Sequence, residues 1–143
     1  MKLAVIGSGY VGLVAGACFS DTGNDVTMVD IDPARIDMLR EGQLPIYEPS
    51  LGEIVRQNVA KGRLRFTSDL PSAIDDTEVV ILAVGTPSAP DGGVDMQWID
   101  AAAEQAAQAI TSYTVIVTKS TVPVGTYKRI ADIVASATNV EFD

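Results

Sequence analysis

The stretch KLAVIGSGYVG (residues 2–12) carries an apolar run into three glycines with the spacing G-x-G-x-x-G. A helical run follows, and a second apolar run, VTMVD (residues 26–30), ends in an acidic residue. A glycine turn between a strand and a helix, with an acid after the next strand, is the context in which this spacing binds a dinucleotide. The alternative is a glycine-rich turn in an ordinary β-α-β unit that binds nothing.

Each residue of this stretch has an expected role. Gly7 turns the chain out of the strand, Gly9 leaves room for a pyrophosphate, and Gly12 lets the helix pack close to the sheet. The N-terminus of the helix directs unpaired N–H groups toward the phosphates. Asp30 is expected to accept hydrogen bonds from the adenosine ribose and to repel a 2′-phosphate, so the pattern favours NAD over NADP.

Composition excludes several classes of function. The chain has 143 residues, a formal net charge of −9, no histidine and a single cysteine. The acidic charge argues against nucleic acid and anionic membranes as partners. The lack of histidine and of paired cysteines argues against a metal site and a disulfide within the chain. The first apolar run is too short for a secretion signal, and we expect a cytoplasmic protein.

Apolar runs predict strands over residues 2–6, 26–30, 78–84 and 114–119, and an alternating run predicts a short strand over residues 63–67. Helical spacing and stop residues predict helices after Gly9 and over residues 33–41, 50–61, 68–74, 96–110 and 125–136. Residues 139–143 look like the start of a further strand. This alternation predicts one α/β domain over residues 1–143: a Rossmann-type, doubly wound parallel sheet in the order 3-2-1-4-5, with room for a sixth strand and helices on both faces.

Helical periodicity also predicts which side chains face the core. The helix after Gly9 is expected to bury Val11, Val14, Ala15, Cys18 and Phe19, with Cys18 as an inert core thiol. The helix over residues 50–61 is expected to bury Leu51, Ile54, Val55 and Val59.

Further candidate site residues follow the strands, because ligands of such sheets bind outside the carboxyl ends of the strands. Thr86 and Thr121 follow the fourth and fifth strands and could bond ribose or phosphate oxygens, or else cap the next helix. Arg35 could approach the adenosine ribose or its phosphate, or be an ordinary surface arginine. Lys119, at the end of the fifth strand, could be a cation at the buried edge of the sheet or an exposed side chain.

Five stretches carry a family resemblance: IGSGYVGL (6–13), VDID (29–32), LPIYEP (44–49), VGTP (84–87) and KSTVPVG (119–125). On these stretches the whole chain resembles the N-terminal NAD-binding domain of the UDP-glucose/GDP-mannose dehydrogenase family. The third and fifth stretches favour the members that act on UDP-glucose over those that act on GDP-mannose or UDP-N-acetylmannosamine. A hydroxyacyl-CoA-type dehydrogenase shares the glycine pattern but not KSTVP, and a free-standing nucleotide-sensing domain is a third alternative.

The resemblance implies NAD contacts at Gly7, Gly9, Tyr10, Val11, Gly12, Asp30, Arg35, Thr86 and Thr121. A lysine is more usual in the family at the position of Arg35. Thr121 would also lie near the reaction centre, where the family uses this threonine to help hold a catalytic water.

The family's reaction is a four-electron oxidation of a sugar C6 alcohol to a carboxylate, with two NAD reduced in turn. An enzyme cysteine forms a thiohemiacetal and then a thioester. In the family this cysteine and its partner lysine, asparagine and aspartate lie in parts that would follow residue 143, and Cys18 does not match the nucleophile. The resemblance therefore implies a domain that holds NAD but cannot oxidise UDP-glucose alone, within a full-length protein that is expected to be a homo-oligomer.

Overall fold

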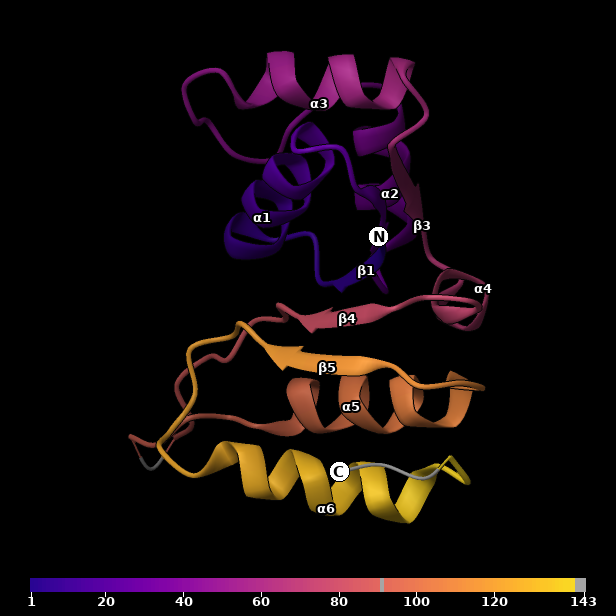
Figure 1. Ribbon diagram of the computed structural model, residues 1–143. Helices are drawn as coiled ribbons and strands as arrows, with labels where there is room; N and C mark the ends of the chain where they lie inside the picture. Colours follow the sequence, from indigo (N-terminus) through magenta and orange to yellow (C-terminus); the bar gives the residue numbers. More distant parts are fainter. Residues whose placement is uncertain (91, 141–143) are drawn as a thin grey trace.

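The computed structural model describes residues 1–90 and 92–140, and its centre is a parallel five-stranded sheet in the order β3-β2-β1-β4-β5 (Figure 1). The strands are β1 (Lys2–Ile6), β2 (Asp25–Val29), β3 (Leu64–Thr67), β4 (Val79–Leu82) and β5 (Val115–Thr118). The predicted fold class and strand order are therefore confirmed. Residues 138–140 are not in a strand, and the rest of the expected sixth strand lies outside the described residues.

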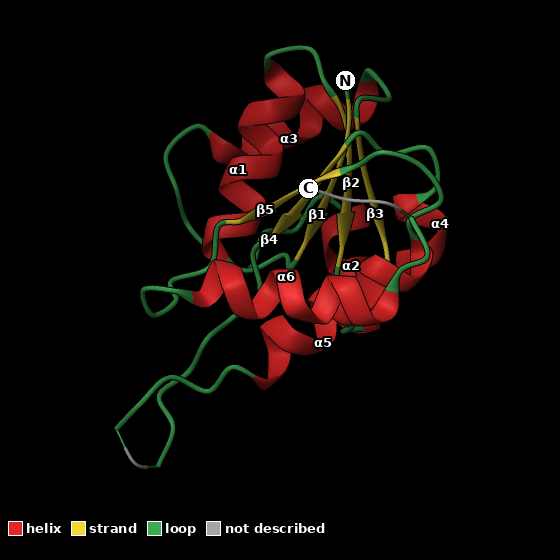
Figure 2. Ribbon diagram, turned by 60° about the horizontal axis from the view of Figure 1, so that its bottom comes forward, coloured by secondary structure: helices red, strands yellow, loops and turns green. Residues whose placement is uncertain are grey.

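In the part of the chain that the structure describes, five helices lie between the strands and a sixth follows β5. They are α1 (Tyr10–Asp21), α2 (Pro33–Arg40), α3 (Leu51–Ala60), α4 (Leu70–Ile74), α5 (Gln97–Ala109) and α6 (Thr126–Ala137). Figure 2 shows the sheet between two layers, with α1 and α3 on one side and α5 and α6 on the other. Among the described residues, no helix combines the length and the apolar character that crossing a membrane requires.

Side chains point alternately to the two faces of the sheet and form a separate hydrophobic core on each face. Leu3 and Val5 of β1 pack with α1, α2 and α3, whereas Ala4 and Ile6 pack with α4, α5 and α6. This alternation follows from the two-residue period of a strand, and burial by helices on both faces accounts for the wholly apolar sequence of β4. The edge strand β5 is different, because Val115 and Val117 remain 43% and 40% exposed.

The predicted inward face of α1 was largely wrong. Ala15 is buried and Val14 is half-buried, but Val11, Cys18 and Phe19 are exposed. The residues against the sheet and its neighbours are instead Gly12, Leu13, Gly16, Ala17 and Ser20. A Cβ at Gly12 would lie 1.9 Å from the Gly7 carbonyl oxygen, and one at Gly16 would lie 2.2 Å from the Met28 sulfur. The helix packs so closely that glycines occupy its points of nearest contact, while Leu13 fills the space beside them and Val11 and Phe19 face out.

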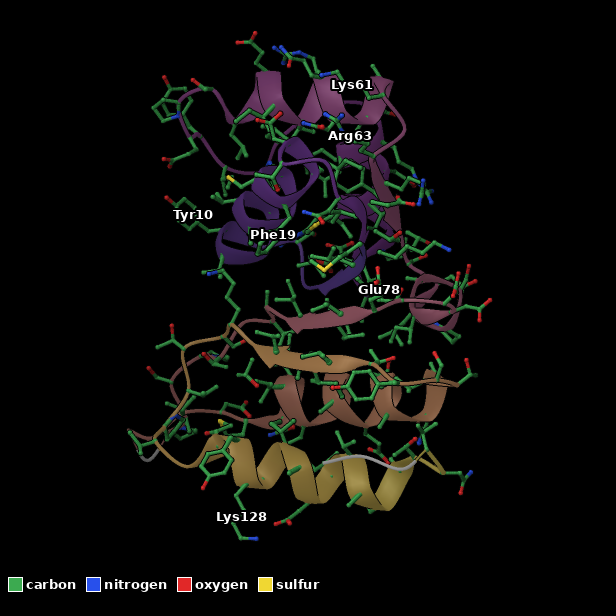
Figure 3. The ribbon with its side chains drawn as sticks, in the orientation of Figure 1. Tyr10, Phe19, Lys61, Arg63, Glu78 and Lys128 are labelled. Atoms are coloured by element: carbon green, nitrogen blue, oxygen red, sulfur yellow. The ribbon has the colours of Figure 1, made fainter. Side chains whose placement is uncertain are left out.

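The inward face of α3 also differs from the prediction at one position. Leu51 and Val55 are buried as expected and Ile54 is half-buried, but Val59 is 40% exposed and Asn58 is buried in its place. The Asn58 amide donates to the Ile54 carbonyl and to Asp21 at the end of α1. Its oxygen accepts two hydrogen bonds from Arg63, which lies under α3 (Figure 3). These hydrogen bonds hold Asn58 on the buried face of α3, and a search for apolar periodicity cannot predict them.

Candidate functional site

A cleft of about 430 Å³ lies where β1, β2 and β4 end. Its walls include the glycine turn, the residues that follow β2 and β4, and parts of α2, α4 and α5. This is the position at which the sequence pattern places a ligand, between the first and fourth strands. Two other cavities among the described residues, one beside β5 and α6 and one over α5 and α6, are lined by neither the glycine turn nor Asp30.

The three glycines of the turn are used in different ways. Gly7 has a φ of +104°, and a Cβ there would lie 2.5 Å from the Ala83 carbonyl oxygen, so the turn requires glycine. Gly12 is held against Gly7 by the close packing of α1. Gly9 is the opposite case, because it lines the cleft and a Cβ there would meet nothing within 4 Å. Gly9 is also the N-cap of α1 and supplies no side-chain hydrogen bond, so the helix N-terminus adjoins the cleft uncovered by a side chain.

Asp30 follows β2 and is fixed by three hydrogen bonds. The Ser8 N–H and hydroxyl donate to Oδ2 at 2.9 and 2.6 Å, and the Asp32 N–H donates to Oδ1 at 3.1 Å. Burial raises the pKa of Asp30, but the bonds from Ser8 and Asp32 and the charge of Arg35 outweigh it, and the pKa is lowered from its ordinary value of 3.8. The cleft therefore presents a carboxylate that is ionised at neutral pH.

Arg35 lies on the cleft wall and is half-buried. It occupies the first turn of α2, where Pro33 follows the N-cap Asp32 and the Asp32 carboxylate accepts from the N–H groups of Ala34 and Arg35. The helix start predicted at this position is confirmed. Its cap brings the Arg35 side chain to the same end of β2 as Asp30, rather than to open surface.

The side chains of Tyr10 and Val11 do not line the cleft. Tyr10 is 55% exposed on the outer side of α1, where its hydroxyl donates to Glu48 at 2.9 Å (Figure 3). This hydrogen bond raises the pKa of Tyr10. Only the backbone N–H groups of Tyr10 and Val11, in the first turn of α1, remain as candidates for a ligand contact.

Thr86 and Thr121 lie together at the ends of β4 and β5. The Thr86 hydroxyl donates to the Thr121 carbonyl at 2.7 Å. Neither threonine caps a helix, because the N-caps of α5 and α6 are Met96 and Gly125. Neither lines the 430 Å³ cleft, although Gly85 and Pro87 beside Thr86 do. Lys119 is exposed, which leaves its side chain outside the core.

Sequence reasoning missed one buried residue, which hydrogen-bonds to Asp30, and most of one wall of the cleft. The missed residue is Ser8, whose signal is a small hydroxyl residue between Gly7 and Gly9, facing the acid that follows the second strand. The missed wall comes from helices and includes Leu70, Trp98 and Gln105. Trp98, in the first turn of α5, lies outside the apolar face of that helix. A large aromatic residue in such a position is the feature of the sequence that could have indicated a ligand contact.

Comparison with known proteins agrees with this geometry. The UDP-glucose/GDP-mannose dehydrogenase family, NAD binding domain, matches residues 1–143. A UDP-glucose 6-dehydrogenase of Rhizobium meliloti is 51% identical over 135 residues, which are 94% of this chain and 31% of that protein. The chain thus spans about a third of the length of this curated relative.

Solved structures give the same result. A UDP-glucose dehydrogenase of Pyrobaculum islandicum superposes with a TM-score of 0.92 at 38% identity, over 98% of this chain and 34% of the other. A GDP-mannose dehydrogenase of Pseudomonas aeruginosa also superposes with a TM-score of 0.92, at 32% identity, over 99% of this chain and 33% of the other. The chain therefore belongs to the UDP-glucose/GDP-mannose dehydrogenase family and corresponds to its NAD-binding domain.

Proposed function

We propose that residues 1–143 form one domain that binds NAD in the 430 Å³ cleft, with the adenosine half at the end of β2. The observation that carries this proposal is the position of Asp30, an ionised carboxylate fixed beside the glycine turn on the wall of that cleft. The residues fit the cofactor: Gly9 leaves open space where a pyrophosphate would approach the backbone, and α1 begins at that point.

The proposal gives each group at the site a task. Asp30 accepts from a ribose hydroxyl, and the first-turn N–H groups of α1, including those of Tyr10 and Val11, face the pyrophosphate. Arg35 stands beside the ribose and the phosphates as a cation. Gly7 and Gly12 allow the tight turn and the close packing of α1, and they could contact NAD only through their backbone atoms.

The nicotinamide half is assigned to the ends of β4 and β5. There the linked pair Thr86 and Thr121 would hold ribose or phosphate oxygens, and Thr121 would lie near the reacting atoms. Bound NAD supplies a hydride acceptor, and the residues of this chain orient it and keep its adenosine end in place.

For the whole protein we propose the oxidation of UDP-glucose at C6 to UDP-glucuronate with two NAD. The identity of 51% to a UDP-glucose 6-dehydrogenase, against 39% to a GDP-mannose 6-dehydrogenase, supports this choice of sugar. The catalytic cysteine is assigned to a part of the protein outside residues 1–143, so this chain alone is expected to bind NAD without turnover. We further propose that the whole protein is a homo-oligomer located in the cytoplasm.

Calorimetric titration of the chain with NAD and with NADP tests the binding claim. The wild-type chain should bind NAD and discriminate against NADP, and Asp30→Ala should weaken NAD binding by about tenfold or more, because it removes hydrogen bonds to a charged acceptor. Asp37→Ala is the matched control, since it removes the same charge from an exposed position of α2 outside the cleft. Equal losses in the two variants, or a preference for NADP, would contradict the assignment.

A further inference from the structure

Ser8 is a fully buried residue whose two donors serve one acceptor. Its side chain is 0% exposed, and both its N–H and its hydroxyl donate to the same oxygen, Oδ2 of Asp30. Ser8 is absent from the wall of the cleft, whereas Asp30 lies on it. The Ser8 hydroxyl can therefore act on a ligand in the cleft only through Asp30.

The acceptor positions of Asp30 can be counted. An ionised carboxylate offers about four lone-pair positions. Ser8 takes both positions on Oδ2, and the Asp32 N–H takes one on Oδ1. One position on Oδ1 remains, so the carboxylate is held from both ends before any ligand arrives.

The hydroxyl contributes what a backbone N–H alone does not. Rotation of a carboxylate about its last side-chain bond is normally broad. The N–H groups of Ser8 and Asp32 each bond one oxygen of this carboxylate, and the Ser8 hydroxyl, 2.6 Å from Oδ2, adds a second donor that further opposes the rotation. Ser20 provides a contrast within α1: it is an equally buried serine whose hydroxyl donates to the Ala17 carbonyl and has no link to Asp30.

We propose that Ser8 is a positioning residue that fixes the Asp30 carboxylate in the orientation that presents its remaining acceptor to a ribose hydroxyl of NAD. This inference rests on the proposed NAD site and adds a residue to its specificity for NAD over NADP. A ribose with a free 2′-hydroxyl meets a preset acceptor, while a 2′-phosphate meets a negative charge that cannot turn away.

A double-mutant cycle tests the dependence on Asp30. NAD and NADP are titrated into the wild-type chain, Ser8→Ala, Asp30→Ala and the double variant, with Ser20→Ala as the control for loss of a buried hydroxyl. We expect Ser8→Ala to weaken NAD binding by about three- to tenfold, to narrow the preference over NADP, and to have no further effect once Asp30 is alanine. Ser20→Ala should leave NAD affinity unchanged even if it lowers the melting temperature.

A ligand-free measurement gives an independent readout. The Asp30 carboxyl is titrated by NMR in the wild-type chain and in Ser8→Ala, where loss of the hydroxyl should raise its pKa, and Ser20→Ala should not. An equal loss of NAD affinity from Ser8→Ala in both Asp30 backgrounds, unchanged or tighter NAD binding, or an unmoved Asp30 pKa would overturn the inference. If the wild-type chain binds no NAD, the proposed function fails; if it binds NAD and only the Ser8 effects are missing, this inference alone fails.

Discussion

The hydroxyl of Thr86 and the carbonyl of Thr121 are joined by a 2.7 Å hydrogen bond that links the chain after β4 to the chain after β5. The two residues are 35 positions apart, so the bond closes one corner of the sheet between segments that meet only in the folded protein. A second bond, from the Ser120 hydroxyl to the Val84 carbonyl at 2.8 Å, supports the same corner. Two hydrogen bonds thus join the segments that form the proposed nicotinamide end of the site.

The first prediction concerns this bond. Thr86→Val keeps the shape of the side chain and removes the donor, so the chain should lose about 1 kcal/mol of unfolding free energy, measured in urea. Thr111→Val makes the same exchange at an exposed position and should change stability by less than about 0.5 kcal/mol. Equal losses of unfolding free energy in the two variants would show that the Thr86–Thr121 bond does not stabilise the fold.

The second prediction separates two glycines of the same turn. Gly12→Ala places a Cβ 1.9 Å from a backbone oxygen and should cost about 3 kcal/mol of stability. Gly9→Ala meets no atom within 4 Å and should leave stability nearly unchanged while weakening NAD binding, because its methyl group enters the cleft. Thermal unfolding and NAD titration of both variants check this. A stable Gly12→Ala chain, or a Gly9→Ala chain with full NAD affinity, contradicts it.

The third prediction concerns the polar contacts of α3. Asn58→Ala removes a buried amide that joins Asp21, Ile54 and Arg63, and should destabilise the chain by about 2–3 kcal/mol in urea unfolding. Gln57→Ala, which loses only an exposed bond to Glu53, is the matched control and should cost less than about 0.5 kcal/mol. NAD affinity should stay unchanged in both variants, since neither residue lines the cleft.

The fourth prediction is a pH profile. The pKa of Asp30 is lowered from 3.8 in the folded chain, so its ionised form favours the fold above the unfolded-state pKa, and this contribution is lost as pH falls through the folded value. The ionised carboxylate is also the form that accepts a hydrogen bond from NAD. NAD affinity should therefore stay constant from neutral pH down toward 3.8 and decline only below this value. Titrations across this range test the point, and an Asp30-dependent midpoint well above 3.8 would be inconsistent with the bonds from Ser8 and Asp32.

Sequence reasoning was most successful where local pattern decides structure. The alternation of strands and helices determines the parallel sheet, and the acid after the second strand leads to Asp30. The prediction for α1 was wrong because counting apolar residues placed Phe19 inside, whereas the points of closest packing require glycine, as at Gly16. Bonds such as that from Tyr10 to Glu48 join distant segments through side-chain geometry, which no local pattern encodes.

The central claim is that NAD occupies the cleft between the glycine turn and Asp30, and the most direct measurement is an amide chemical-shift titration of the isotope-labelled chain with NAD. We expect saturable shifts centred on Ser8, the first turn of α1 and Asp30, together with shifts at Gly85 and Trp98, which also line the cleft. Saturable shifts centred instead on the cavity beside β5 and α6, or no saturable shifts at all, would contradict the account.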